Sequence, residues 1–175
     1  MLGPFGEVLL MDWGVARLVG DVTEVVASET IEKLTMARTM DGAAIGTPGF
    51  MSPEQSRGEL HLLDGRSDVW SLGAVLYELL TLQPAYEAPN LYALMFAVAS
   101  GPPMDPRERA PGRNIPEELA EVCLRAMAAE RADRFATAAE LGSAVEAFLE
   151  GSKRREAAQR HVAEAEAAWA RYGAL

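Results

Sequence analysis

The carboxylate of Asp12 is the first candidate for chemistry in this sequence. Asp12-Trp13-Gly14 directly follows the short apolar run 8–11, and a turn-like Gly3-Pro4-Phe5-Gly6 precedes that run, which favours a β-hairpin strand. A carboxylate at a strand end suits a hard divalent cation, because Mg²⁺ takes carboxylate oxygens and shares its remaining shell with phosphate and water. An ordinary strand-terminating turn is the alternative, and Asp12 alone does not decide between them.

Further motifs follow Asp12 in a fixed order. They are Gly46-Thr47-Pro48-Gly49-Phe50-Met51-Ser52-Pro53-Glu54, then Asp64-Gly65-Arg66-Ser67-Asp68-Val69-Trp70, then Ala132-Asp133-Arg134-Phe135. Together with Asp12-Trp13-Gly14, this series closely resembles the C-terminal lobe of a bacterial Hanks-type serine/threonine protein kinase. The resemblance extends from about residue 7 to about residue 151, with Trp13 where the family has Phe and Ser52 where it has Ala.

The resemblance implies a role for each matched residue. Asp12 would bind the Mg²⁺ that bridges the phosphates of ATP. Thr47 would face the acceptor hydroxyl and favour Ser/Thr over Tyr substrates. Glu54 and Arg134 would form a buried ion pair, and Asp68 would cap the central helix while accepting hydrogen bonds from the catalytic loop.

The resemblance also makes residues 20–46 the activation segment. This stretch mixes polar residues and Gly without a sustained period, so it reads as a long loop. Its hydroxyls are candidate phosphoacceptors, and a phosphate there needs basic partners to order the loop. The candidates are Ser28, Thr30, Thr35 and Thr39 in this stretch and Thr47 directly after it, and the nearest bases in sequence are Arg17 and Arg38.

Helices must position these groups, and the sequence predicts four in the region of the resemblance. Residues 68–82 are apolar on nearly every side, which is typical of a core helix with Asp68 placed to cap it. Residues 90–100 form a second helix, and residues 116–130 carry an apolar stripe at helical spacing. Thr137 and Glu140 form a capping box for a fourth helix that Gly151 is expected to end. The expected fold is mainly α, a kinase-like C-lobe bundle with a short N-terminal β-hairpin and a long activation-segment loop.

The composition changes after residue 151, which divides the chain into a partial kinase domain, 1–151, and a charged C-terminal helix, 152–175. Within the second part, Ala158, Val162, Ala165, Trp169 and Tyr172 are spaced 4, 3, 4 and 3. This spacing is a heptad seam, so oligomerisation through 152–172 is one expectation. Two heptads are few, and a helix laid against the domain or half-exposed as a linker is the other reading.

Several groups that a protein kinase needs are missing from the 175 residues. The sequence contains no Gly-x-Gly-x-x-Gly, neither Lys33 nor Lys153 lies in an apolar strand, and neither histidine is followed by Arg-Asp. The N-lobe, the ATP-binding lysine and the catalytic Asp are therefore expected to be absent. Because catalysis here depends on several cooperating groups, we expect negligible kinase activity and weak or absent Mg²⁺ and ATP binding.

Composition limits the partners. The net charge of −10 repels phosphate backbones, so nucleic acid is a poor candidate. No stretch approaches the roughly 18 uninterrupted apolar residues of a membrane span, and the single Cys123 argues against a disulfide scaffold. We therefore expect a cytoplasmic protein whose partners are a protein substrate or another kinase. Two functions remain open: a serine/threonine kinase lobe, truncated and inactive by itself, or a non-catalytic binding or docking module with the same fold.

Overall fold

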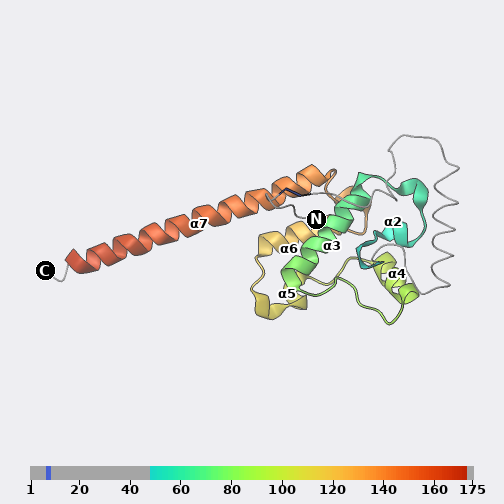
Figure 1. Ribbon diagram of the computed structural model, residues 1–175, viewed down its shortest axis with the longest axis horizontal. Coiled ribbons are helices and arrows are strands. Elements are labelled where there is room, and N and C mark those ends of the chain that lie inside the picture. Colours follow the sequence, from blue (N-terminus) through green and yellow to red (C-terminus); the bar gives the residue numbers. More distant parts are fainter. Residues whose placement is uncertain (1–6, 9–47, 173–175) are drawn as a thin grey trace.

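The computed structural model describes residues 7–8 and 48–172 of the chain. Residues 48–172 consist of helices joined by turns and short loops (Figure 1). In chain order the elements are η2 (Pro48–Phe50), α2 (Pro53–Ser56), η3 (Leu60–Leu62), α3 (Gly65–Thr81), α4 (Leu91–Ser100), α5 (Pro106–Arg109), η4 (Pro111–Arg113), α6 (Glu117–Ala126), η5 (Arg131–Asp133) and α7 (Ala138–Tyr172). The expectation of a mainly helical fold is confirmed for this part of the chain.

Helix α3 forms the centre of the helical body. It packs against α6, α7, α5 and η2, and Figure 1 shows it between α6 and the α2–α4 pair. One face carries Trp70, Ala74 and Tyr77 into a core cluster with Val98, Cys123 and Met127. A second cluster joins Val69 of α3 to Ala126, Phe135 and Leu141. The predicted core helix at this position is therefore confirmed, and its apolar residues hold the body together.

Gly73 sets how closely α3 and α6 approach. A Cβ atom built on Gly73 would lie 2.8 Å from the Cβ of Ala126 and 2.8 Å from the Cγ of Met127. The sulfur of Cys123 lies 3.5 Å from the carbonyl oxygen of Gly73 in the same contact. Only a residue without a side chain fits between the two helices at this separation.

The start of α3 differs from the prediction by one turn. The N-cap is Asp64, whose carboxylate accepts the backbone N–H of Arg66 at 2.8 Å, and the expected cap at Asp68 is wrong. Asp68 lies in the first turn and is exposed. Both residues can cap a helix, and Asp64 has a tertiary partner as well, because Arg131 contacts its carboxylate at 3.1 Å.

Two further predicted helices are confirmed with adjusted ends. Asn90 caps α4 by accepting the N–H of Ala93 at 2.9 Å. Helix α6 begins where expected but ends at Ala126, four residues before the predicted end. Its stripe buries Cys123 and Ala126 against α3.

The predicted end at Gly151 is wrong, because α7 runs through this residue to Tyr172. A glycine inside a helix costs about 1 kcal/mol relative to alanine, and the residues around it are mostly strong helix formers. From residue 158 onward the described side chains are exposed, and Figure 1 shows this part of α7 extending away from the body. The C-terminal residues therefore continue the last helix of the body rather than starting a new one.

The predicted hairpin, apart from Glu7 and Val8, and the long loop 20–46 lie outside the described residues. Among the helices that the structure describes, none combines the length and apolar character needed to cross a bilayer.

Candidate functional site

The short helix α2 positions Glu54. Ser52 is its N-cap: the Ser52 side chain accepts the N–H of Gln55, and the Gln55 side chain accepts the N–H of Ser52 at 2.8 Å. Pro53 occupies the first helical position, where its missing N–H costs nothing. This reciprocal capping holds a four-residue helix that would otherwise be too short to form. The Ser-x-x-Gln spacing is a sequence signal for this cap that the sequence analysis overlooked.

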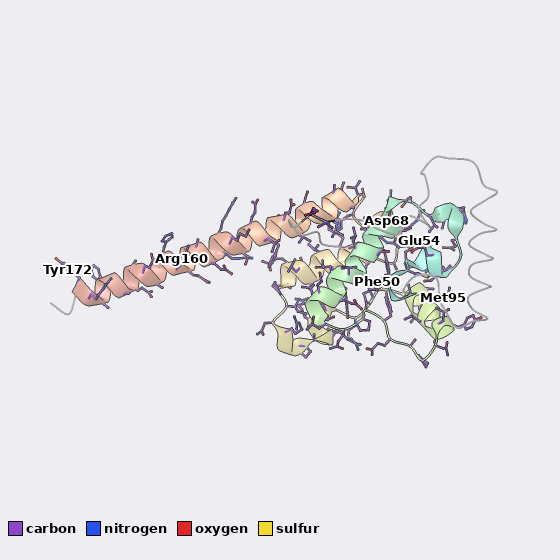
Figure 2. The ribbon with its side chains drawn as sticks, in the orientation of Figure 1. Phe50, Glu54, Asp68, Met95, Arg160 and Tyr172 are labelled. Atoms are coloured by element: carbon purple, nitrogen blue, oxygen red, sulfur yellow. The ribbon has the colours of Figure 1, made fainter. Side chains whose placement is uncertain are left out.

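Glu54 and Arg134 lie 80 positions apart in sequence and form a two-pronged ion pair. The Nη1 and Nη2 atoms of Arg134 donate to the Oε1 and Oε2 atoms of Glu54 at 2.8 and 2.9 Å. The two side chains are 0% and 3% exposed. Figure 2 shows Glu54 next to the first turns of α3, within the body. The structure thus joins the segment before α3 to the loop before α7.

Every N–H group of the Arg134 guanidinium has an acceptor. Beyond its two bonds to Glu54, it donates to the backbone carbonyl oxygens of Ala128 at 2.8 Å, Arg66 at 3.2 Å and Ala129 at 3.3 Å. The guanidinium also lies 4.9 Å from the centre of the Trp70 ring. An arginine has five N–H donors, so this buried cation is fully satisfied.

Ser67 completes the environment of the Glu54 carboxylate. Its hydroxyl donates to the Oε1 atom of Glu54 at 2.7 Å, and Ser67 is itself buried. No sequence signal pointed to Ser67 as a partner of Glu54. The carboxylate therefore has hydrogen bonds from two side chains that come from different parts of the chain.

The pKa of Glu54 is lowered from its ordinary 4.5 to about 2. Burial by itself raises this pKa, but the hydrogen bonds from Arg134 and Ser67 outweigh burial. Because the pKa in the folded state lies below the pKa in the unfolded state, protonation favours unfolding. The contribution of Glu54 to stability is thus present above pH 4.5 and is lost as the pH falls towards 2.

We therefore expect the free energy of unfolding to fall steeply between pH 4.5 and 2, by about 3 kcal/mol from Glu54 alone. Urea unfolding of the wild type and of Glu54→Gln across this range measures the effect, because the glutamine variant cannot titrate at this position. Between pH 4.5 and 2, the free energy of unfolding of the wild type is expected to fall by about this much more than that of Glu54→Gln. Two parallel curves would show that Glu54 keeps an ordinary pKa in the folded protein.

A second, more exposed ion pair lies near the first. The carboxylate of Asp64 caps α3 and contacts the Nη1 atom of Arg131 at 3.1 Å, and the same nitrogen bonds to the carbonyl oxygen of Leu62. These two side chains are about one-third exposed, so the pair contributes less than the buried one. It attaches the start of α3 to the same loop that carries Arg134.

The remaining predicted site residues are not placed by the structure. Asp12, Thr35, Thr39 and Thr47 lie outside the described residues. Within the described part of the chain, no group of three or more His, Cys, Asp or Glu side chains is arranged to hold a metal ion. The expectation of a magnesium ligand therefore rests on Asp12 alone.

One face of α3 carries apolar side chains that the described residues leave exposed. Leu72 and Val75 are each 45% exposed, and Leu79 and Leu82 are 66% and 70% exposed. A groove of about 340 Å³ runs along this face and is lined by Val75, Glu78, Leu79, Leu82, Gln83 and Pro84. Large exposed apolar surface of this kind typically marks an interaction site.

Several known proteins resemble this chain in sequence over most of its length. No protein-family model matches the chain. The chain is 34% identical to the serine/threonine-protein kinase PknD of Chlamydia pneumoniae over 155 residues, which is 87% of this chain and 16% of that kinase. It is 36% identical to the serine/threonine-protein kinase PknB of Mycobacterium leprae over 141 residues, 81% of this chain and 20% of that kinase. A probable serine/threonine-protein kinase PknB of Bifidobacterium longum is 34% identical over 86% of this chain.

The chain is therefore related to bacterial serine/threonine protein kinases over most of its own length, and the resemblance noted in the sequence is confirmed. It spans about a fifth or less of the length of these relatives.

Proposed function

We propose that this chain is the C-terminal lobe of a serine/threonine protein kinase, the part that receives the acceptor protein and anchors the activation segment. The observation that carries this proposal is the buried Glu54–Arg134 pair, which ties the segment just before α3 to the loop before α7. In such a lobe, residues 1–151 belong to the kinase domain and residues 152–175 extend from it. Thr47 would lie next to the acceptor hydroxyl, and Thr35, Thr39 and Thr47 are the candidate phosphoacceptors.

Asp12 is the one residue that we propose as a ligand of Mg²⁺, and through that ion as a contact to ATP. Bound Mg²⁺ would offset the charge that develops on the transferred phosphoryl group. Asp12 would hold that ion by one carboxylate, and a single carboxylate gives low affinity. We therefore propose that the 175-residue polypeptide binds Mg²⁺ and ATP weakly and has negligible kinase activity by itself, because its sequence lacks the groups that position the nucleotide and the acceptor.

A chimera tests the proposal directly. The part of the M. leprae kinase that precedes its match to this chain would be fused in frame ahead of Glu7, and transfer of γ-phosphate to a protein substrate would be measured. We expect transfer by the chimera, background signal from the 175-residue chain, and at least about a hundredfold loss on Asp12→Asn. Asp21→Asn is the matched control and is expected to keep most of the activity.

Two results would contradict the proposal. The first is Asp12-dependent phosphoryl transfer by the 175-residue chain, which would show that the missing groups are not needed. The second is a folded chimera whose low activity does not change on Asp12→Asn, which would show that Asp12 is not the metal ligand.

A non-catalytic docking module is the second candidate. The observation in its favour is the exposed apolar face of α3, formed by Leu72, Val75, Leu79 and Leu82. This function predicts that the chain binds a separate full-length kinase and that Leu79→Glu abolishes this binding. Leu149→Glu makes the same change at an exposed leucine of α7 that does not line the groove, and it serves as the control. Binding in this assay together with an inactive, folded chimera would favour docking over catalysis.

A further inference from the structure

The exposed part of α7 continues the face by which this helix packs on the body. Leu141, Ala144 and Phe148 lie on the packed part at spacings of 3 and 4, and Leu141 is buried. The same alternation leads through Gly151 and Arg155 to the heptad seam, which is Ala158, Val162, Ala165, Trp169 and Tyr172. A helix drifts by only about 20° per heptad from such a repeat, so the seam stays on one side of α7.

The seam is exposed although it carries the largest apolar side chains of this part of the helix. Val162 is 58% exposed, and Trp169 and Tyr172 are each 79% exposed. Figure 2 shows Arg160 and Tyr172 on the stretch of α7 that lies away from the body. Trp and Tyr are the side chains that contribute most at protein interfaces, and a single helix in water cannot bury them.

The body itself ends its contact with α7 near Arg155. The Nη1 atom of Arg155 donates to the Oε1 atom of Glu118 on α6 at 3.1 Å, and its guanidinium lies 5.9 Å from the centre of the Phe148 ring. Beyond this point the described side chains on the seam are exposed. Among the described residues none covers the seam, so a second helix can lie along it from Ala158 to Tyr172.

We propose that the seam pairs with the seam of a second copy of this chain, with the two helices antiparallel. In this register Ala158 faces Trp169 of the second copy, Val162 faces Ala165 of the second copy, and Arg155 faces Tyr172 of the second copy. Each layer then joins a small side chain to a larger one, or a cation to an aromatic ring, and the helices keep a nearly constant separation. The two bodies lie at opposite ends of the paired helices.

The parallel alternative fits the same residues poorly. In a parallel pair each seam residue faces its own copy. The two Trp169 rings would push the helices apart, the two Ala158 side chains would need them close together, and the two Arg155 cations would repel each other. Charge also favours the antiparallel pair. In the antiparallel register, residues 155–161, with two bases and one acid, lie opposite residues 166–172 of the second copy, which carry one acid and one base, whereas a parallel pair would set the two basic stretches side by side.

The experiment measures the mass of the whole chain in solution by sedimentation equilibrium, at concentrations from about 1 to about 100 µM. The wild type is expected to shift from one chain to two across this range. Ala165→Glu puts a charge in the seam and is expected to raise the dissociation constant at least about tenfold. Ala167→Glu makes the same change on the opposite face of α7 and is expected to leave the dissociation constant unchanged. Circular dichroism checks that both variants keep their helix content.

Cross-linking tests the orientation. A mixture of Ala158→Cys and Trp169→Cys chains is expected to form the mixed disulfide in preference to the disulfide between two Ala158→Cys chains. The natural Cys123 does not compete, because it is buried and burial raises its pKa to about 12. An excess of the disulfide between two Ala158→Cys chains would overturn the antiparallel arrangement.

Three other results would overturn the proposal as a whole. The wild type could stay monomeric at every concentration, the two glutamate variants could weaken the dimer equally, or neither could weaken it. A monomer that cosediments with phosphatidylglycerol vesicles would instead assign the seam to a lipid surface. None of these results depends on phosphoryl transfer, so the proposal stands or falls independently of the kinase function.

Discussion

Replacing Glu54 by alanine is expected to lower the free energy of unfolding by about 3 to 5 kcal/mol. The substitution leaves the Arg134 guanidinium buried, with its side chain 0% exposed and two of its N–H groups without their carboxylate acceptors. An uncompensated charge in the protein interior is among the most costly defects a single substitution can create. Urea unfolding followed by circular dichroism at neutral pH measures this loss.

Glu59→Ala provides the matched control. Its carboxylate forms an ion pair with Arg57 at 3.7 Å, and both side chains are at least 36% exposed. A surface pair of this kind contributes at most about 1 kcal/mol. If Glu54→Ala is no more destabilising than Glu59→Ala, the buried pair does not hold the two segments together.

The double variant Glu54→Ala/Arg134→Ala distinguishes the interaction energy of the pair from the cost of leaving one partner unpaired. Removing both charges removes the uncompensated group, so the double variant is expected to be less destabilised than the sum of the two single variants. Additive losses would mean that the two side chains do not interact in the folded protein.

Replacing Trp70 by alanine is expected to lower the free energy of unfolding by about 3 to 5 kcal/mol and the Tm by about 10 °C. Trp70 is fully buried on α3, and its ring stacks on Tyr86 with 6.5 Å between ring centroids. The same ring lies beneath the guanidinium of Arg134. The substitution therefore opens a cavity in the main core cluster and removes the surface that supports the ion pair.

Trp169→Ala is the matched control, because it makes the same change at a side chain that is 79% exposed. At concentrations low enough to keep the chain monomeric, it is expected to change the Tm by no more than about 2 °C. Thermal unfolding measures the Tm of both variants. Equal losses of Tm would show that α3 is not the centre of the core. Trp70→Phe keeps most of the ring and is expected to give an intermediate Tm.

The sequence predicted the helices well where the signal is local. The apolar residues of α3 and the helical spacing on α6 determine which side chains can be buried, and a helix forms its backbone bonds within four residues. The start of the helix at Asn90 was similarly predicted from local sequence, and the structure shows that Asn90 is the N-cap of α4. Periodicity does not identify partners, however, and the pairing of Glu54 with Arg134 was expected only from the family resemblance.

The errors occur where distant residues or neighbouring helix formers decide the outcome. Asp64 and Asp68 are both possible caps, and the structure pairs Asp64 with Arg131, which lies 67 positions away. Glycine is typical of a helix end, yet α7 continues through Gly151 to Tyr172 because strong helix formers lie on both sides of it. No sequence pattern predicted the other hydrogen-bond partners of the buried pair, which are the Ser67 hydroxyl and three backbone carbonyl groups.

The amino-acid sequence by itself thus determined the helical class, the core helix α3 and the kinase relationship, because each depends on residue types at short spacing or in a fixed order. Only the tertiary structure decided which carboxylate caps α3, how completely Arg134 is satisfied, and that the seam of α7 is left exposed. The physical reason is that hydrogen-bond geometry and burial depend on which backbone and side-chain atoms meet across many tens of residues, and that meeting is a property of the folded chain.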